Sequence, residues 1–408
     1  MLQRTVSRPP VAAPCSARWC RTVAALFWSG LVATALASCA LPDARIKAAE
    51  AAAARHVERG YRVDRRYATV SAHETWTMGA DIVDVSVVMP AGTASFPLVV
   101  YLPGLGESSA SGAAWRRSWA EAGYAVVSLQ PASVGPVIWS SELARDGAFR
   151  KLAEQEFSAP SLAKRLTIVS EALTELERRS RGATDGLYRR IDLSRIAVAG
   201  FDLGAQTAMV VAGEHIDGVD SPKWPIAVKA VVTLSPYADF AGMGLERDFR
   251  PVRLPVLGVT SFEDRDPYGL ITTAAIRRAP FQYMPDGHKY LLLLSATPHA
   301  LLSGREMPAA QPRVDRVQAD SAASRAGTES GSEAARRKRS RGFGSRGSDA
   351  ASGSGPDSIA HWKLQLGNVE GVTTAYLDAT VKNDGVAQEW LHKDAGRWLG
   401  KSGELQSR

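Results

Sequence analysis

Uninterrupted apolar runs alternate with stretches of helical spacing through the middle of the chain. The runs are FPLVVYLP (96–103), YAVVSL (124–129), RIAVAG (195–200), VKAVVTL (228–234), PVLGVTS (255–261) and KYLLLLS (289–295). Strands of this kind are typical of a sheet that is covered on both faces, as parallel sheets are. Because helical stretches separate them, the pattern predicts an α/β protein with a doubly wound, mostly parallel sheet.

The pattern continues on both sides of these runs. RRYATV (65–70) and ADIVDVSVVMP (80–90) predict earlier strands, whereas GVTTAYLDATV (371–381) and AQEWL (387–391) have the spacing of closing helices. We therefore expect one α/β domain over residues 62–303 and 358–400.

Residues 304–357 interrupt this domain with a segment of Ser, Ala, Gly and Arg that has few large apolar side chains. Such a composition does not bury enough surface to offset the entropy of ordering, so we predict a disordered insertion. Its basic run 336–339 is interpreted as a solvated loop, with contact to an anionic surface as the alternative. We expect no nucleic-acid partner.

The N-terminus has the features of a secretory signal peptide over residues 1–38. Four arginines precede the uncharged stretch 23–37, which would span only about 22 Å as a helix, short of a bilayer core. Leu36-Ala37-Ser38-Cys39 resembles the bacterial lipobox, which implies cleavage before Cys39 and lipidation of its thiol. An ordinary secretory signal is the alternative.

Lipidation of Cys39 implies a membrane-anchored protein of the bacterial cell envelope. Ala40 at the second mature position resembles the outer-membrane sorting signal, which would place the protein facing the periplasm of a Gram-negative cell. The Ala-rich, charged residues after it predict that 39–61 form a lipidated N-terminus and an exposed helical stalk.

Composition narrows the chemistry further. The chain has 408 residues, a formal net charge of +7 and cysteines only at positions 15, 20 and 39. All three cysteines precede the predicted domain, which excludes a disulfide scaffold, a thiolate metal site and a cysteine nucleophile within it. Neither a phosphate-binding glycine loop nor a metal-ligand cluster occurs in the sequence, so we expect no cofactor and no metal.

The main chemical motif is Gly200-Phe201-Asp202-Leu203-Gly204. It follows an apolar strand and opens an Ala-rich helix, which is the position of a nucleophile elbow. The flanking glycines suit a turn in which side chains would collide with the neighbouring strand. Asp202 is thus the candidate nucleophile.

A histidine and an acidic turn follow later in the chain, each after a strand. His299 comes after the run 289–295 and is the candidate base, because imidazole titrates near neutrality. Asp264 comes after the run 255–261 and is the preferred acid to orient it, with Asp266 or Glu263 as alternatives. The backbone N–H of Leu203 and that of Leu105 or Gly104 are candidates to bind an oxyanion. The assignment of these N–H groups depends on the roles of Asp202, His299 and Asp264.

FPLVVYLPGLGES, GFDLGAQTAM, EDRDP and SATPHALLSG together resemble the α/β-hydrolases, and most closely the dienelactone-hydrolase-like and platelet-activating-factor-acetylhydrolase-like bacterial proteins. Those relatives carry serine or cysteine where this chain has Asp202. Aspartate at this place is similar to haloalkane dehalogenases and epoxide hydrolases, in which it attacks an sp³ carbon. Those enzymes usually insert a lid domain, for which the short segment 236–255 leaves no room.

The resemblance implies a hydrolase with an Asp202–His299–Asp264 triad that acts on a small ester, halide or epoxide-type substrate. The alternative is a catalytically inactive binding or scaffold lipoprotein that retained the fold after its elbow serine was replaced.

Overall fold

The computed structural model describes residues 44–182, 186–238, 244–305 and 356–408. The predicted signal peptide, Cys39 and residues 306–355 of the predicted insertion lie outside the described residues. The described residues form one nine-stranded sheet with the order β1-β2-β4-β3-β5-β6-β7-β8-β9. Its strands are β1 (Thr69–Met78), β2 (Asp81–Pro90), β3 (Phe96–Leu102), β4 (Ala125–Pro131), β5 (Ile191–Phe201), β6 (Val228–Leu234), β7 (Val256–Ser261), β8 (Lys289–Leu294) and β9 (Gly403–Ser407).

The central strands β4, β3, β5, β6, β7 and β8 run parallel, and antiparallel strands close both edges of the sheet. The predicted α/β class with a mostly parallel sheet is confirmed. Because the carboxyl ends of parallel strands meet at one edge, the loops that follow β3, β5, β6, β7 and β8 are brought together there.

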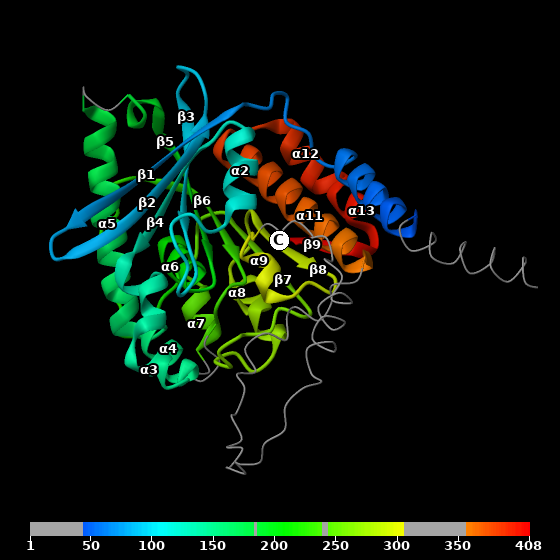
Figure 1. Ribbon diagram of the computed structural model, residues 1–408. Coiled ribbons are helices and arrows are strands. Elements are labelled where there is room, and N and C mark those ends of the chain that lie inside the picture. Colours follow the sequence, from blue (N-terminus) through cyan, green and yellow to red (C-terminus); the bar gives the residue numbers. More distant parts are fainter. Residues whose placement is uncertain (1–43, 183–185, 239–243, 306–355) are drawn as a thin grey trace, which may run out of the picture.

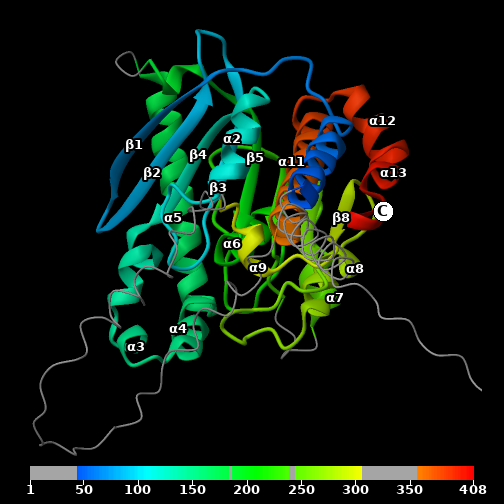
Figure 2. The same ribbon diagram turned by 45° about the vertical axis from the view of Figure 1, so that its right-hand side comes forward.

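Helices cover both faces of the sheet (Figures 1 and 2). They are α2 (Ala113–Glu121), α3 (Glu142–Arg145), α4 (Phe149–Glu156), α5 (Ala159–Arg181), α6 (Leu203–Ala212), α7 (Leu245–Phe249), α8 (Ala279–Tyr283), α9 (His299–Leu302), α11 (Pro356–Val381), α12 (Gly385–Lys393) and α13 (Ala395–Leu399). Short 3-10 helices are η1 (Ala132–Val134), η2 (Pro136–Ser140), η3 (Tyr188–Arg190), η4 (Ala274–Arg278) and η6 (Gly400–Ser402).

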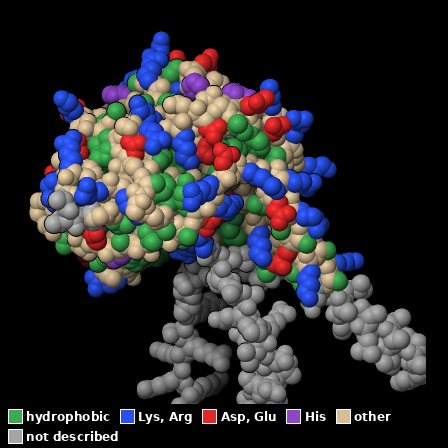
Figure 3. Space-filling view, turned by 90° about the horizontal axis from the view of Figure 1, so that it is seen from above, with side chains coloured by type: hydrophobic (Ala, Val, Ile, Leu, Met, Phe, Trp, Pro, Cys, Tyr) green, Lys and Arg blue, Asp and Glu red, His purple; other side chains and the backbone are tan. Residues whose placement is uncertain are grey.

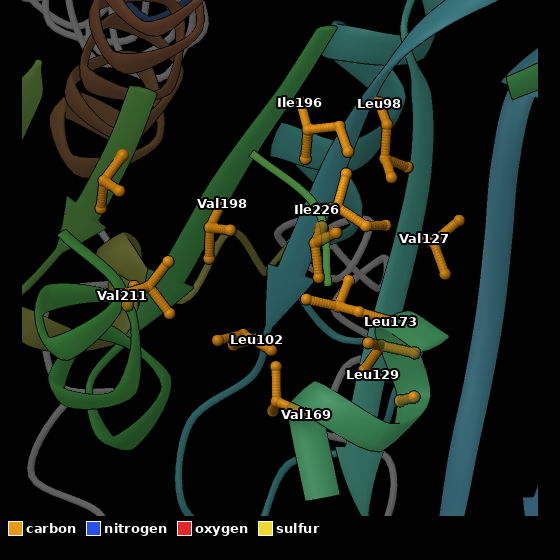
Figure 4. Packing of buried hydrophobic residues seen from close by; sticks show 14 of the residues in the cluster. Leu98, Leu102, Val127, Leu129, Val169, Leu173, Ile196, Val198, Val211 and Ile226 are labelled. Carbon is orange, nitrogen blue, oxygen red and sulfur yellow. The ribbon is translucent and has the colours of Figure 1, made fainter. Parts of the chain in front are cut away.

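Two hydrophobic layers hold these helices to the sheet. One layer packs α5, α6, α7 and α8 against one face, and the other packs α2, α9, α11, α12 and α13 against the opposite face. Figure 4 shows part of the first layer, where Leu102 of β3 lies close to Val169 and Leu173 of α5 and Leu98 lies close to Ile226. Alternate residues of each strand serve opposite layers, which explains why the central strands are apolar throughout.

The observed domain extends beyond residue 400, where the sequence pattern predicts its end. β9 pairs antiparallel with β8, so the domain includes residues 403–407. β1 also starts later than the run 65–70 suggests and extends to Met78, paired along its length with β2. Both strands are partly exposed at sheet edges, where polar residues obscure the apolar pattern.

Residues 44–58 form a helix whose side chains are mostly exposed, as expected, but the helix lies against the domain instead of standing apart from it (Figure 1). The His56 ring stacks on Trp398 with centroids 4.8 Å apart, and Trp398 Nε1 donates to the His56 carbonyl at 2.8 Å. His56 Nε2 also lies 2.9 Å from Asn368 Oδ1. A Cβ on Gly367 of α11 would lie 2.2 Å from Val57, so the absence of a side chain at Gly367 lets this helix approach α11 closely.

Basic and acidic side chains are mixed on the face seen in Figure 3. Within the described ranges, no helix has both the length and the apolar character needed to cross a bilayer.

Candidate active site

The predicted elbow is a tight turn between β5 and α6. Asp202 has φ 52° and ψ −111°, a strained conformation for a residue with a side chain. A Cβ on Gly200 would lie 2.2 Å from the Gly204 oxygen, and one on Gly204 would lie 1.9 Å from the Leu102 oxygen. Only glycine fits at either position, and the turn thus directs Asp202 out at the carboxyl edge of the sheet.

Asp202 is 4% exposed. Burial raises the pKa of its carboxyl and the charge of Asp266 adds to this, while His299, Arg277 and the backbone N–H of Leu203 oppose the rise. The net result is a raised pKa, so the anion is less stable here than in water. The backbone N–H of Leu203, which the sequence predicts as an oxyanion donor, thus interacts with the Asp202 carboxyl itself.

His299 is the first residue of α9, at the end of the short loop that follows β8. Its Nδ1 is 2.8 Å from Oδ1 of Asp264, and its side chain is 14% exposed. The Phe201 ring packs against the imidazole with centroids 5.0 Å apart, which places His299 beside the elbow. With Nδ1 engaged by the carboxylate, Nε2 is the nitrogen that can exchange a proton with a reacting group.

Among the three acidic candidates, Asp264 is the one that contacts His299 within the described part of the chain. Asp266 accepts the backbone N–H groups of Tyr268 at 3.0 Å and Ile271 at 2.8 Å, so it shapes its own turn. Glu263 is exposed. The geometry therefore selects Asp264 as the orienting acid.

Asp264 is fully buried and closely surrounded by donors. Thr260 Oγ1 donates to its Oδ2 at 2.7 Å, and Arg277 Nε lies 3.3 Å from its Oδ1. Burial alone would raise the pKa of Asp264, but Arg277, His299 and Thr260 outweigh it and the pKa is lowered. Asp264 is thus held as an anion, the form that orients an imidazole.

Ser235 and Arg277 belong to this network, although the sequence reasoning did not identify them. Ser235 Oγ donates to Asp264 Oδ1 at 2.9 Å and lies 2.9 Å from His299 Nδ1. Arg277 Nη1 donates to the carbonyls of Ser235 and Pro236, both at 3.1 Å. Ser235 has φ 55° and follows β6 directly, and this position after a strand is the signal that could have found it.

A further carboxyl occupies the turn that follows β3. Glu107 Oε2 accepts the backbone N–H of Gly104 at 3.0 Å. That N–H, one of the predicted oxyanion donors, is therefore engaged by the chain's own side chain. Burial raises the pKa of Glu107 to about 7, with a further contribution from Asp202. Leu105, the alternative donor, is buried in the same turn.

No metal cluster is found within the described ranges, where no three or more His, Cys, Asp or Glu side chains are suitably grouped. Comparison with models of known protein families finds no match, and no curated protein matches the sequence. The fold and site define the class of protein as an α/β protein with a mostly parallel sheet.

Proposed function

We propose that the protein is a hydrolase in which Asp202 is the nucleophile, His299 the base and Asp264 the acid that orients it. The observation that carries this proposal is the pairing of His299 Nδ1 with a buried Asp264 anion beside the elbow. A histidine fixed in this way presents Nε2 as a base.

The chemistry has two steps. In the first, a carboxylate oxygen of Asp202 attacks an electrophilic carbon and the leaving group departs, forming an ester on the enzyme. In the second, His299 takes a proton from water, and the resulting hydroxide attacks the ester carbonyl. The acyl C–O bond breaks, the departing alkoxide takes the proton from His299 and leaves as an alcohol, and the Asp202 carboxyl loses its proton to solvent. Attack requires ionised Asp202, so the rate of the first step should rise with pH through its raised pKa.

An sp³ carbon is a better target for this site than a carboxylic ester. Attack of Asp202 on an ester would form an anhydride and would need an oxyanion site. One of the two N–H groups expected there, that of Gly104, donates to Glu107. These features support a halide or epoxide-type substrate.

Membership of the α/β-hydrolase superfamily is part of the proposal. Its support is the order of nucleophile, acid and histidine along the chain, each after a strand, and an elbow between a strand and a helix. The relatives with an elbow aspartate usually carry a lid domain, but here the described part of the β6–β7 connection holds only α7.

Asp202 can be tested by trapping its ester. In full-length His299→Gln the ester should form but not hydrolyse, giving a stable mass increase on the peptide with Asp202 after incubation with an epoxide or an alkyl halide. Asp202→Asn is the matched blank. Asp202→Ser should gain weak activity on small activated esters, since His299 and Asp264 remain in place.

A non-catalytic binding protein is the second candidate, and the low exposure of Asp202 favours it. The two candidate functions predict different outcomes of these experiments. Absence of any adduct in His299→Gln, together with no esterase activity in Asp202→Ser, would favour the binding protein. The ordered pair of His299 and Asp264 supports the hydrolase, because a scaffold has no need of it.

We also propose a lipid anchor on Cys39 at the bacterial cell envelope. It rests on the lipobox-like residues 36–39. Cys39→Ser should abolish incorporation of labelled fatty acid and release the protein from membranes, whereas membrane retention of this variant would contradict the anchor.

A further inference from the structure

Resting on the proposed function, we propose that Glu107 is a catalytic acid that protonates the oxygen leaving from the carbon attacked by Asp202. The substrate class is then an epoxide rather than an organic halide, because only an oxygen leaving group needs this proton.

Both acidic side chains lie close to Gly104. Gly104 donates its N–H to Glu107 Oε2 at 3.0 Å, and a Cβ on Gly104 would lie only 3.4 Å from Cβ of Asp202. The Glu107 carboxyl is therefore near enough to the nucleophile for the charge of Asp202 to act on it, and it lies on the turn from β3 where a reacting oxygen would be stabilised in this architecture.

Hydrogen bonds fix this turn. Gln130 Nε2 donates to the carbonyls of Gly104 at 3.0 Å and Glu107 at 2.8 Å. Trp139 Nε1 donates to the Gly106 carbonyl at 3.1 Å, and the Gly106 N–H donates to Val134 at 2.8 Å. Glu107 is thus held in one place, as a proton donor to a bound substrate must be.

Charges around the pair favour one proton on Glu107 and none on Asp202. Both carboxyls have raised pKa values, chiefly through burial, and the charge of Asp202 adds to the rise for Glu107, so a proton on Glu107 is favoured while Asp202 is ionised. His299 lowers the pKa of both groups, but it is the strongest of the influences that lower that of Asp202. The other ionisable groups that interact with Glu107 are Arg305, Tyr268 and Tyr101.

The step balances with these two groups alone. An Asp202 oxygen forms a bond to an epoxide carbon, the C–O bond of the ring breaks, and the ring oxygen takes the proton from Glu107. This gives a hydroxyalkyl ester on Asp202 and a Glu107 carboxylate. Water activated by His299 then cleaves the ester to a diol, and solvent returns the proton to Glu107.

A halide has less support from this site. A departing halide takes no proton and is stabilised by N–H donors, but the Gly104 N–H donates to Glu107 and the Trp139 indole donates to Gly106. An ionised Glu107 would repel the halide as it leaves.

The test compares two probes in the full-length His299→Gln protein, where ester formation is measured alone. Styrene oxide and benzyl bromide carry the same ring, and the rate of adduct formation on Asp202 is followed by mass spectrometry. Adding Glu107→Gln should slow the epoxide reaction by about 100-fold and change the bromide reaction by less than about threefold. The epoxide rate should also fall as pH rises through the pKa of Glu107, which is about 7 with His299 in place and is higher in this variant because the imidazole that lowers it is gone.

Glu370→Gln is the matched control, since its carboxyl has a similarly raised pKa but lies on α11. It should leave both rates unchanged. The bromide reaction also reports whether the site of Glu107→Gln is folded. Epoxide and bromide rates that change equally, or an adduct with bromide alone, would overturn the role of Glu107 and leave Asp202 as nucleophile. No adduct with either probe would overturn the proposed function itself.

Discussion

The carboxyl edge of the sheet and the buried face of α11 each contain a paired acidic side chain, but the pairs differ. At the edge, Asp264 contacts His299 and the fully buried Arg277. On α11, Asp378 pairs with Lys382 at 2.7 Å, whose side chain is 26% exposed. The contacts of Asp264 hold the His299 imidazole at the loop cluster, whereas Asp378 and Lys382 join α11 to other segments, because Tyr124 donates to Asp378 and Lys382 donates to the Ala122 carbonyl.

Each region also contains a glutamate whose pKa burial raises to about 7, Glu107 at the edge and Glu370 on α11. Glu107 interacts with Asp202 and His299, a second carboxyl and a base. The charged groups that act on Glu370 are Arg117, Arg66 and Glu121. A raised pKa therefore reports burial in both regions, and only the neighbouring groups mark one of them as a candidate site.

The largest expected effect is the loss of stability when either of the two paired aspartates is replaced, and the two losses should differ in size. Asp264→Ala leaves Arg277 buried without its anion and should lower the free energy of unfolding by about 3–5 kcal/mol. Asp378→Ala should cost about 2–3 kcal/mol, because Lys382 can turn its ammonium toward solvent. Urea denaturation at neutral pH measures both.

The contribution of Asp264 to stability should depend on pH, and the direction of this dependence follows from its lowered pKa. Its folded pKa is lowered, so its contribution is present above the unfolded pKa of about 4 and is lost as pH falls through the folded value. The gap between wild type and Asp264→Ala should narrow in acid. Glu263→Ala, an exposed neighbour, is the control and should change stability by less than about 0.5 kcal/mol. An Asp264→Ala loss no larger than the control would contradict the ion pairing.

The next effect compares the two glutamates as a function of pH. The folded pKa of each is raised, so stability is full below the unfolded pKa of about 4.5 and falls as pH rises through about 7. Glu107→Gln and Glu370→Gln should each be more stable than wild type above about pH 8, by roughly 2–3 kcal/mol, and should approach it below about pH 4.5.

Denaturation at the two pH values checks this, and Glu389→Gln on the exposed face of α12 should show no such trend. The glutamates should behave alike in stability and differ only in reactivity at Asp202. A pH-independent difference for Glu107→Gln would contradict its raised pKa, and with it the proton assigned to this group.

The fold was predictable where burial dominates the sequence. Strands buried on both faces leave continuous apolar runs, which is why β3 to β8 were found from the pattern alone. β9 (Gly403–Ser407) was missed because an edge strand needs no apolar pattern and gains its hydrogen bonds from β8. The docking of residues 44–58 was missed because it depends on contacts such as His56 with Trp398, which no local pattern records.

The site was predictable where a chemical residue lies in the short segment after an apolar strand. Asp202, His299 and Asp264 each do so, and the structure brings His299 to Asp264 and beside the elbow. Glu107 lies no further from the end of β3 than His299 does from the end of β8, but charged residues are common in such turns, and Arg277 lies in η4, far from a strand end. Their roles arise only once the parallel order of β3, β5, β6, β7 and β8 gathers these loops at one edge.

The smallest effect concerns single hydroxyl groups on the two paired aspartates. Tyr61→Phe removes a donor 2.9 Å from Asp378, and Ser235→Ala removes one 2.9 Å from Asp264. Each should cost about 1.5 kcal/mol of unfolding free energy, since a hydrogen bond to a charged group is lost. Only Ser235→Ala should also slow hydrolysis of the Asp202 ester, because Ser235 Oγ is in addition 2.9 Å from His299 Nδ1 and helps to fix the imidazole.

Tyr283→Phe, at a tyrosine 40% exposed, is the control and should stay within about 0.5 kcal/mol of wild type. Equal ester lifetimes in Ser235→Ala and Tyr61→Phe would show that the edge network is structural, as the network on α11 is.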